Sequence, residues 1–336
     1  MKKIKNLFAA FLIIYLCFYI FTSSADAVDS VKNSVYACLN TIIPSLFAFM
    51  VVTDFLQRSG LHLIVTKPVS FALSKIFKID ENLISLFLLS QIGGFPVGAS
   101  LVKNIAEDKC ISKELAEKLL ASFFCSGPTF IICGVALQCY NNPNIGFIMY
   151  FGIVISNLII FIITCKTNKN TKMDFPSKIS FGADMFISSV NNGTKSICKV
   201  CSMIVFFSII VSSLSFIGSY YVNPLLEISK ITEIRFPPYV CSALISFGGV
   251  CVLIQISTIT SGKIRMKYLL LSRVPVCILS YLITYILFEI FFHGDIAYCY
   301  KFTEIYLSRQ ASIFPSVLLM IMSLMLITVV NRQNAQ

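Results

Sequence analysis

The chain has 336 residues and a formal net charge of +11; 57% of the residues are hydrophobic and only 13% are charged. Soluble domains carry about 25% charged residues, so this composition, with a mean hydropathy of +0.83, excludes an ordinary soluble protein. The apolar runs are long and continuous, which predicts membrane helices and excludes the alternating pattern of an outer-membrane barrel.

The basic and sulfur-containing residues do not indicate a nucleic-acid or metal site. The basic residues are scattered among connectors beside apolar segments, as the positive-inside rule describes, and form no basic face with aromatic stacking positions. Most of the 13 cysteines lie inside apolar segments, where cysteine behaves as a small hydrophobic residue. Cys198 and Cys201 have the C-x-x-C spacing, but no second pair accompanies them and the chain has only two histidines. We expect no nucleic-acid partner, no metal and no cofactor.

The first 32 residues read as a targeting or anchoring segment. Lysines precede an apolar run over 7–21, and Ser24-Ala25-Asp26-Ala27 resembles a signal-peptidase site. The segment 1–32 is therefore either a cleaved signal peptide or a signal-anchor helix. We favour the anchor, because the rest of the chain is embedded in the membrane and an anchor sets its orientation.

A first membrane repeat is predicted over 33–165. The segment 83–106 is as long as a span, but Ser90-Gln91-Ile92-Gly93-Gly94-Phe95-Pro96-Val97-Gly98 breaks it at its centre. Glycine and proline at bilayer depth free backbone groups that lipid cannot satisfy, so a break survives only where protein or a water-filled cavity covers it. We predict a re-entrant hairpin over 83–106. Ser126-Gly127-Pro128 breaks the next helix, as a solute contact or a simple proline kink.

A polar basic linker over 166–180 leads to a second predicted repeat over 181–292. There Ser246-Phe247-Gly248-Gly249-Val250 breaks the apolar segment 239–260, and we predict a second hairpin. The residues 293–336 are predicted to form an amphipathic connector and a last membrane helix.

The predicted fold is an all-α polytopic membrane protein of two inverted repeats, whose re-entrant hairpins meet near the bilayer midplane. This topology has one conflict. A second hairpin that opens on the face opposite to the first would place the basic cluster from Lys263 to Arg273 outside the cytoplasm, against the positive-inside rule.

Paired breaks in the two halves of one chain point to a transporter's solute site. The freed N–H groups at a helix start suit an anionic solute, whereas close helix packing is the alternative role of the glycines. The two glutamines either contact the solute or hydrogen-bond neighbouring helices. The predicted solute-binding residues are Gln91, Gly93, Gly94, Phe95, Pro96, Gly98, Ser126, Gly127, Pro128, Gly248, Gly249 and Gln255.

Glu227 is a carboxylate in a short apolar segment. At membrane depth it would bind a proton or sodium ion, or pair with a basic group; the alternative is a loop glutamate at the headgroups. The sequence contains no G-x-S-x-G, H-E-x-x-H or phosphate-binding glycine loop, so we expect no enzyme.

Several ordered motifs resemble those of a known family. Gln91 to Ala99 is similar to the hairpin motif of the YlbJ-type sporulation integral membrane proteins, and Phe123 to Ile132 resembles the stretch that follows it. Cys125 stands where that family has asparagine, and its usual glycine after Glu-x-[ST] is replaced around Lys230 to Thr232. The likeness extends over about Val35 to Tyr285 and includes Ile43 to Phe47, Leu226 to Ser229, and Ser246 to Gly249 with Gln255.

This family belongs to the nucleoside recognition or Gate-domain group, which is related in architecture to concentrative nucleoside transporters. The resemblance implies a role in endospore formation, including movement of dipicolinate across a membrane that surrounds the forespore. We therefore expect transport of a small polar, anionic solute, with a coupling proton or sodium ion and a homo-oligomer as open possibilities. The alternatives are a nucleoside-type transporter and a non-transporting membrane scaffold for spore-envelope assembly.

Overall fold

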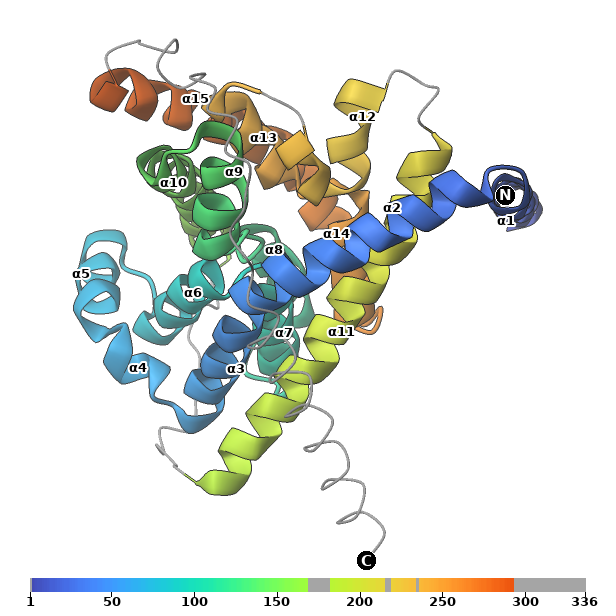
Figure 1. Cartoon of the computed structure of the whole chain (residues 1–336). Helices are drawn as coiled ribbons and strands as arrows, with labels where there is room; N and C mark the ends of the chain where they lie inside the picture. The colour runs from blue at the N-terminus through green and yellow to red at the C-terminus, as the bar shows by residue number, and fades with distance from the viewer. Residues whose placement is uncertain (1, 169–181, 215–218, 234–235, 293–336) are drawn as a thin grey trace, which may run out of the picture.

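The computed structural model describes residues 2–168, 182–214, 219–233 and 236–292, and the regular elements in these ranges are all helical (Figure 1). Four helices of the described chain are long and apolar enough to cross a membrane, and a bent pair over 24–59 makes a fifth. The predicted all-α, polytopic membrane fold is confirmed. The connector and helix expected over 293–336, and most of the linker over 166–180, lie outside the described residues.

The N-terminal helices form a long bent arm along one side of the molecule (Figure 1). They are α1 (Lys2–Thr22), α2 (Ser24–Ala37), the π-helical turn η1 (Cys38–Ile42) and α3 (Ile43–Ser59). The bend of 52° falls at η1 and Pro44, where a π-turn and a proline interrupt the regular hydrogen bonds. Tyr15 Oη of α1 donates to the carbonyl of Ser213, 2.6 Å away. Whether this helix is an anchor or a cleaved peptide stays a prediction.

The chain first reverses at Gly94. The elements here are α4 (His62–Val65), α5 (Lys67–Phe77), α6 (Glu81–Gly93) and α7 (Phe95–Glu107). Near the start of α6, the hydroxyl of Ser85 lies 2.6 Å from the hydroxyl of Thr66. Thr66 belongs to the short segment that follows α3. Near the end of α7, Asn104 Nδ2 donates to Gln57 Oε1 of α3 over 3.1 Å. Both ends of the α6–α7 pair thus lie near the C-terminal end of α3.

A broken helix and a long straight one complete the first half. They comprise α8 (Lys113–Ser122), an irregular stretch over 123–127, the π-helical η2 (Phe130–Ala136), α9 (Leu137–Tyr140) and α10 (Pro143–Thr167). Asn142 caps α10 by accepting the N–H of Asn144 over 3.0 Å. At the other end of α10, Asn168 accepts a hydrogen bond from Lys118 of α8 (3.0 Å).

The second half contains α11 (Ala183–Ser213), α12 (Ser219–Leu226), the 3₁₀ turn η3 (Ile228–Glu233), α13 (Pro238–Phe247), α14 (Gly249–Ile259) and α15 (Lys267–Phe292). The long helix α11 runs beside α2 and α3, and α15 packs on α13, α10 and α8 (Figure 1). Between α12 and η3 the chain turns at Glu227.

The basic connectors gather at one end of the bundle, here called the basic face. Lys263, after α14, forms an ion pair with Glu107 at the end of α7 (2.7 Å). Lys118 of α8 lies 5.6 Å above the ring of Tyr268 at the start of α15. The connector from α14 to α15 therefore shares a face with the connector from α7 to α8. The conflict with the positive-inside rule does not arise, and that rule predicts that the basic face lies in the cytoplasm.

The segment 239–260 is a broken span, not the expected hairpin. The start of α13 lies at the face opposite to the basic face, because Tyr140 Oη at the end of α9 donates to the carbonyl of Phe236 (2.6 Å). The end of α14 lies at the basic face, beside Glu107. Residues Pro238–Ile259 form one apolar span of 22 residues. Gly248 and Gly249 interrupt this span between α13 and α14, as residues 123–127 interrupt the helix between α8 and η2.

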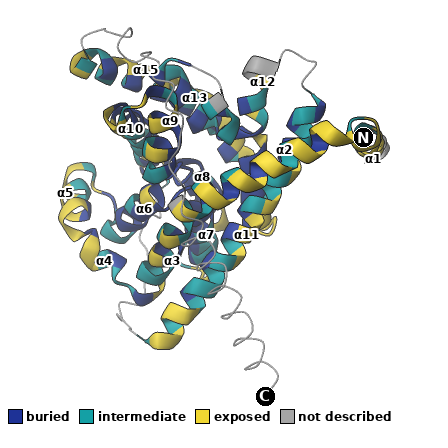
Figure 2. Ribbon diagram, in the orientation of Figure 1, coloured by how far each residue is buried: buried dark blue, intermediate teal, exposed yellow. Residues whose placement is uncertain are grey.

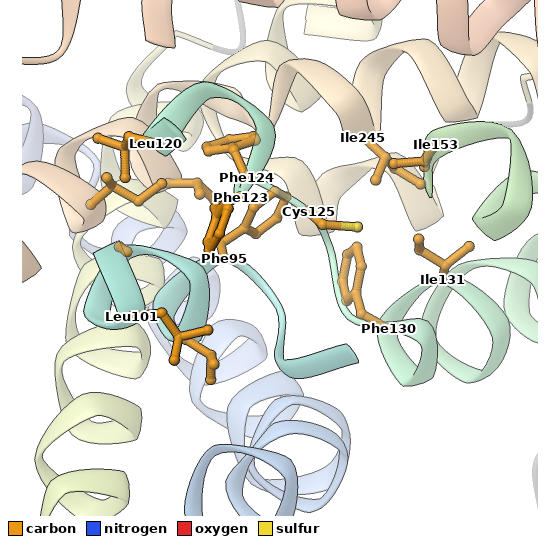
Figure 3. Packing of buried hydrophobic residues seen from close by; sticks show 14 of the residues in the cluster. Phe95, Leu101, Leu120, Phe123, Phe124, Cys125, Phe130, Ile131, Ile153 and Ile245 are labelled. Carbon is orange, nitrogen blue, oxygen red and sulfur yellow. The ribbon is translucent and has the colours of Figure 1, made fainter. Parts of the chain in front are cut away.

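The centre of the molecule is packed around these breaks. Helices α6, α7 and α8 are largely buried, whereas α4, α5 and the outer side of α2 are exposed (Figure 2). Phe95 of α7 packs against Phe124 of the irregular stretch with ring centroids 4.4 Å apart, and Cys125 and Phe130 continue the apolar layer (Figure 3).

Candidate functional site

The turns at Gly94 and Glu227 and the break of the first half meet at a small central cavity of about 50 Å³. Its polar lining is Ser126, Gln255, Glu227 and Ser229, together with the backbone of Gly94 and Gly127. Ile42, Leu46, Phe95, Pro96, Phe130, Val200, Ile204, Ile228 and Val252 supply its apolar wall. A cavity of this size holds one or two water molecules, since a water occupies about 30 Å³ of the liquid.

The structure brings seven of the predicted residues to this cavity and keeps six away from it. Those that line it are Gly94, Phe95, Pro96, Ser126, Gly127, Gln255 and Glu227. Those that do not are Gln91, Gly93, Gly98, Pro128, Gly248 and Gly249. Ser229 was not singled out from the sequence, although it follows Glu227 by two residues.

Several helices begin at the cavity. α7 starts at Phe95, the helix that leads into η2 starts at Pro128, and η3 starts at Ile228. The unpaired N–H groups at a helix start carry partial positive charge. The N-terminal end of α7 therefore contributes positive partial charge to the cavity, while α6 and α12 end at the same turns with negative partial charge.

Glu227 is the acidic residue of this cavity and is 2% exposed. Its carboxylate accepts the N–H of Ser229 (3.0 Å) and the hydroxyl of the same residue. It thus caps η3 at the turn between α12 and η3. These bonds and the neighbouring helix starts offset part of the cost of burying a carboxylate.

Gly94 holds a backbone conformation that other residues avoid. Its φ is +82° with ψ of 178°, a region open almost only to glycine. A Cβ placed there would lie 3.3 Å from the N atom of Gly127, so the two breaks also approach each other closely. This glycine serves both the turn and the close backbone contact.

Gly98 and Gly248 act in packing. A Cβ on Gly98 would lie 2.0 Å from the carbonyl oxygen of Phe123, and one on Gly248 would lie 2.2 Å from the ring of Phe124. Close helix packing, which the sequence analysis gave as the alternative role of the glycines, therefore applies at both positions.

Gln91 joins helices behind the cavity. Its Nε2 donates to the carbonyl of Ser122 (3.2 Å), and its Oε1 accepts from Asn157 Nδ2 (3.1 Å). Asn157 Nδ2 also donates to the carbonyl of Phe124 (3.1 Å). These carbonyls lie at the end of α8, where no helical N–H follows, so the two amides supply donors that lipid cannot.

Arg273 was grouped with the basic connectors in the sequence, but it is buried, with 1% of its surface exposed. It donates from Nη1 to the carbonyl of Ser246 (2.9 Å), at the end of α13, and from Nη2 to that of Ala121, at the end of α8. Its guanidinium lies 4.3 Å from the ring centre of Phe124. Arg273 therefore ties together the two broken spans. The sequence signal for this buried role is an arginine at the seventh position of an apolar helix.

A second, larger cavity of about 350 Å³, here called the vestibule, lies between the central cavity and the basic face. It is lined by α3, α7 and α11, and Pro96 lines both cavities. Its charged lining residues are Asp54, Arg58, Lys103, Glu107, Lys195 and Lys199.

No cluster of three or more histidine, cysteine or acidic side chains suited to a metal occurs among the described residues. The chain is similar to the sporulation integral membrane protein YlbJ of Bacillus subtilis (strain 168). The two are 22% identical over 158 residues, which are 47% of this chain and 39% of that protein. No family profile and no solved structure matches the chain. The similarity supports the resemblance to YlbJ-type proteins, and with the apolar helices it identifies an integral membrane protein.

Proposed function

We propose that the protein carries a small polar, anionic solute across a bacterial membrane during sporulation. The observation that carries the proposal is the meeting of both halves at one buried cavity, to which the first half contributes Gly94 and Gly127 and the second Glu227 and Gln255. Unwound backbone at this depth is costly, because no water satisfies it. A membrane scaffold has no need of it, whereas transporters bind solutes at such breaks.

Dipicolinate, moving across a membrane that surrounds the forespore, is our proposed solute. The motif resemblance and the sporulation name of the similar protein support this choice, and the helix starts around the cavity favour its carboxylates. The central cavity of about 50 Å³ is too small for it. Helices α7 and α14 must therefore separate for the solute to pass, as alternating access requires.

A nucleoside is the second candidate, because Glu227 lies in the same cavity. A carboxylate opposes a bound dianion unless it is protonated or paired with a cation. It would instead accept hydrogen bonds from the hydroxyl groups of a neutral nucleoside.

Flux into liposomes tests the proposal. Purified protein is reconstituted, and uptake of radiolabelled dipicolinate and of nucleosides is compared with that of empty liposomes. Gly94→Val is the variant expected to be inactive. Gly182→Ala is its control, because a Cβ there meets nothing within 4 Å. We expect wild type and the control to take up dipicolinate and the solute to be recovered unchanged, since no chemical conversion is proposed.

Nucleoside uptake without dipicolinate uptake would favour the second candidate. Equal flux with and without protein for both solutes would overturn transport and favour a scaffold for spore-envelope assembly.

A further inference from the structure

Positive side chains outnumber negative ones in the lining of the vestibule. Its two carboxylates are already paired, because Arg58 Nε lies 2.7 Å from Asp54 Oδ2 and Lys263 Nζ lies 2.7 Å from Glu107 Oε1. Asn192 Nδ2 donates to the same oxygen of Asp54 (3.3 Å). The two carboxylates of the vestibule are therefore paired directly with Arg58 and Lys263, and Lys103 adds a weaker electrostatic interaction with Glu107.

Those three lysines are Lys103 of α7 and Lys195 and Lys199 of α11. Within the described part of the chain, none of the three has a carboxylate oxygen within 4.0 Å. Lys195 and Lys199 are one helical turn apart, a spacing at which like charges disfavour a helix. Among the described residues, three ammonium groups thus line one cavity without a direct ion pair of their own.

Positive-inside lysines do not by themselves explain this arrangement. Lys113, Lys166 and Lys267 lie at the same basic face and are exposed, as Lys195 and Lys199 are, but they line no part of the vestibule. The vestibule lysines differ because they come from two helices that face each other across a cavity of about 350 Å³, within the range of small-molecule sites. Ser100, Asn104 and Ser196 add neutral hydrogen-bonding groups to the same wall.

We propose that the vestibule is a separate docking site for a small dianion, held by Lys103, Lys195 and Lys199 before it reaches the central cavity. A dianion places one full negative charge against each of the two helices, whereas a monoanion offers a single charge to both. The site lies at the basic face, so it takes the dianion from the cytoplasmic side. The inference rests on the proposed function for the onward path of the dianion, but not for its docking.

Equilibrium binding tests the docking site independently of flux. The probes are radiolabelled dipicolinate and inorganic phosphate as dianions, and pyridine-2-carboxylate as the matched monoanion. Binding is measured on the full chain in phosphatidylcholine bilayers, where no anionic headgroup competes. The triple variant Lys103→Gln, Lys195→Gln, Lys199→Gln is compared with Lys113→Gln, Lys166→Gln, Lys267→Gln, which removes the same charge from the same face.

We expect the vestibule triple variant to bind dipicolinate at least about tenfold more weakly than wild type, with a flatter dependence of the affinity on NaCl. The affinity of the control variant should stay within about twofold of wild type. The triple variant with arginine at the same three positions should bind as wild type. In flux, the vestibule triple variant should raise the half-saturation concentration and keep the maximal rate, because the central cavity is unchanged.

Equal weakening in the vestibule and control variants, or equal affinity for the dianions and the monoanion, would overturn the inference. Lysine-dependent dianion binding without any flux in the wild type would instead remove the proposed transport and leave the docking site standing.

Discussion

Gly94 combines a turn with a contact between the two breaks of the first half. Gly94→Ala should lower the free energy of unfolding by about 1–3 kcal/mol, because a Cβ strains the positive φ. The added atom also meets the N atom of Gly127 at 3.3 Å. Thermal unfolding in detergent measures the change, with Gly182→Ala as the neutral control. Equal melting of both variants would show that the turn at Gly94 relaxes without cost.

Glu227 should couple solute movement to an ion. Its carboxylate is buried in the cavity, and glutamine keeps its shape and acceptor oxygen but removes the titratable charge. Glu227→Gln should bind solute and exchange it across liposome membranes, yet lose accumulation driven by a proton or sodium gradient. Glu114→Gln, at an exposed carboxylate, is the control. Normal accumulation by Glu227→Gln between pH 5 and 8 would exclude coupling through this residue.

His62 should make the stability of the fold depend on pH. Burial lowers the pKa of this imidazole below its ordinary value, with a smaller opposing effect of its hydrogen bond to the carbonyl of Leu56. The unfolded chain then binds a proton more readily than the folded one, so stability is complete above about pH 6.5 and falls as the pH decreases below it. His62→Gln keeps a donor but does not titrate.

The difference in melting temperature between wild type and His62→Gln, followed from pH 7.5 to 5.5, measures this effect. A difference that stays constant over that range would contradict it.

At the scale of elements, Arg273 holds the ends of α8 and α13. Arg273→Met leaves the carbonyls of Ala121 and Ser246 without these donors, at about 1–3 kcal/mol each. Removing a buried charge recovers some desolvation energy, but the two carbonyls remain in place, so a net loss of stability is expected. Lys267→Met, on an exposed side chain of the same helix, should change stability by only about 0.5 kcal/mol.

Arg273→Lys separates the positive charge from the fork of donors, because lysine is a single-point donor. A melting temperature between those of wild type and Arg273→Met is expected. A methionine variant as stable as wild type would show that other groups satisfy both carbonyls.

The sequence predicted where the apolar segments break better than it predicted the direction of the chain after each break. Glycine and proline at Gly94 and over 126–128 marked breaks in apolar segments, because lipid offers no partner for the freed backbone groups. The same rule marked Gly248 and Gly249 but not the direction of the chain there, since 22 apolar residues suit a span as well as a hairpin. Arg273 was missed because it was read with the basic connector before it, and only the contacts at the ends of α8 and α13 reveal its place.

At the scale of the whole molecule, the basic face should lie in the cytoplasm. It contains the connector over 108–112 after α7 and the connector over 260–266 after α14, which the pair of Glu107 and Lys263 holds together. Protease sites inserted after Asp108 and after Gly262 should both be cut from the cytoplasmic side of inverted vesicles. A site inserted after Asn141, at the opposite face, should be cut only from the other side. Cleavage after Gly262 from the opposite side would restore the hairpin topology for 239–260.

The contact between Arg273 and the carbonyl of Ala121 joins residues 152 positions apart in the chain. A bacterial ribosome adds about 5–20 residues per second, so about 8–30 s pass between the synthesis of the two partners. During that interval the nascent chain holds an inserted α8 whose last carbonyls lack their guanidinium partner. A protease that acts on incompletely packed membrane proteins would cleave the chain in this state. Slow translation between codons 121 and 273 should therefore lower the yield of mature protein more than the same delay after codon 292.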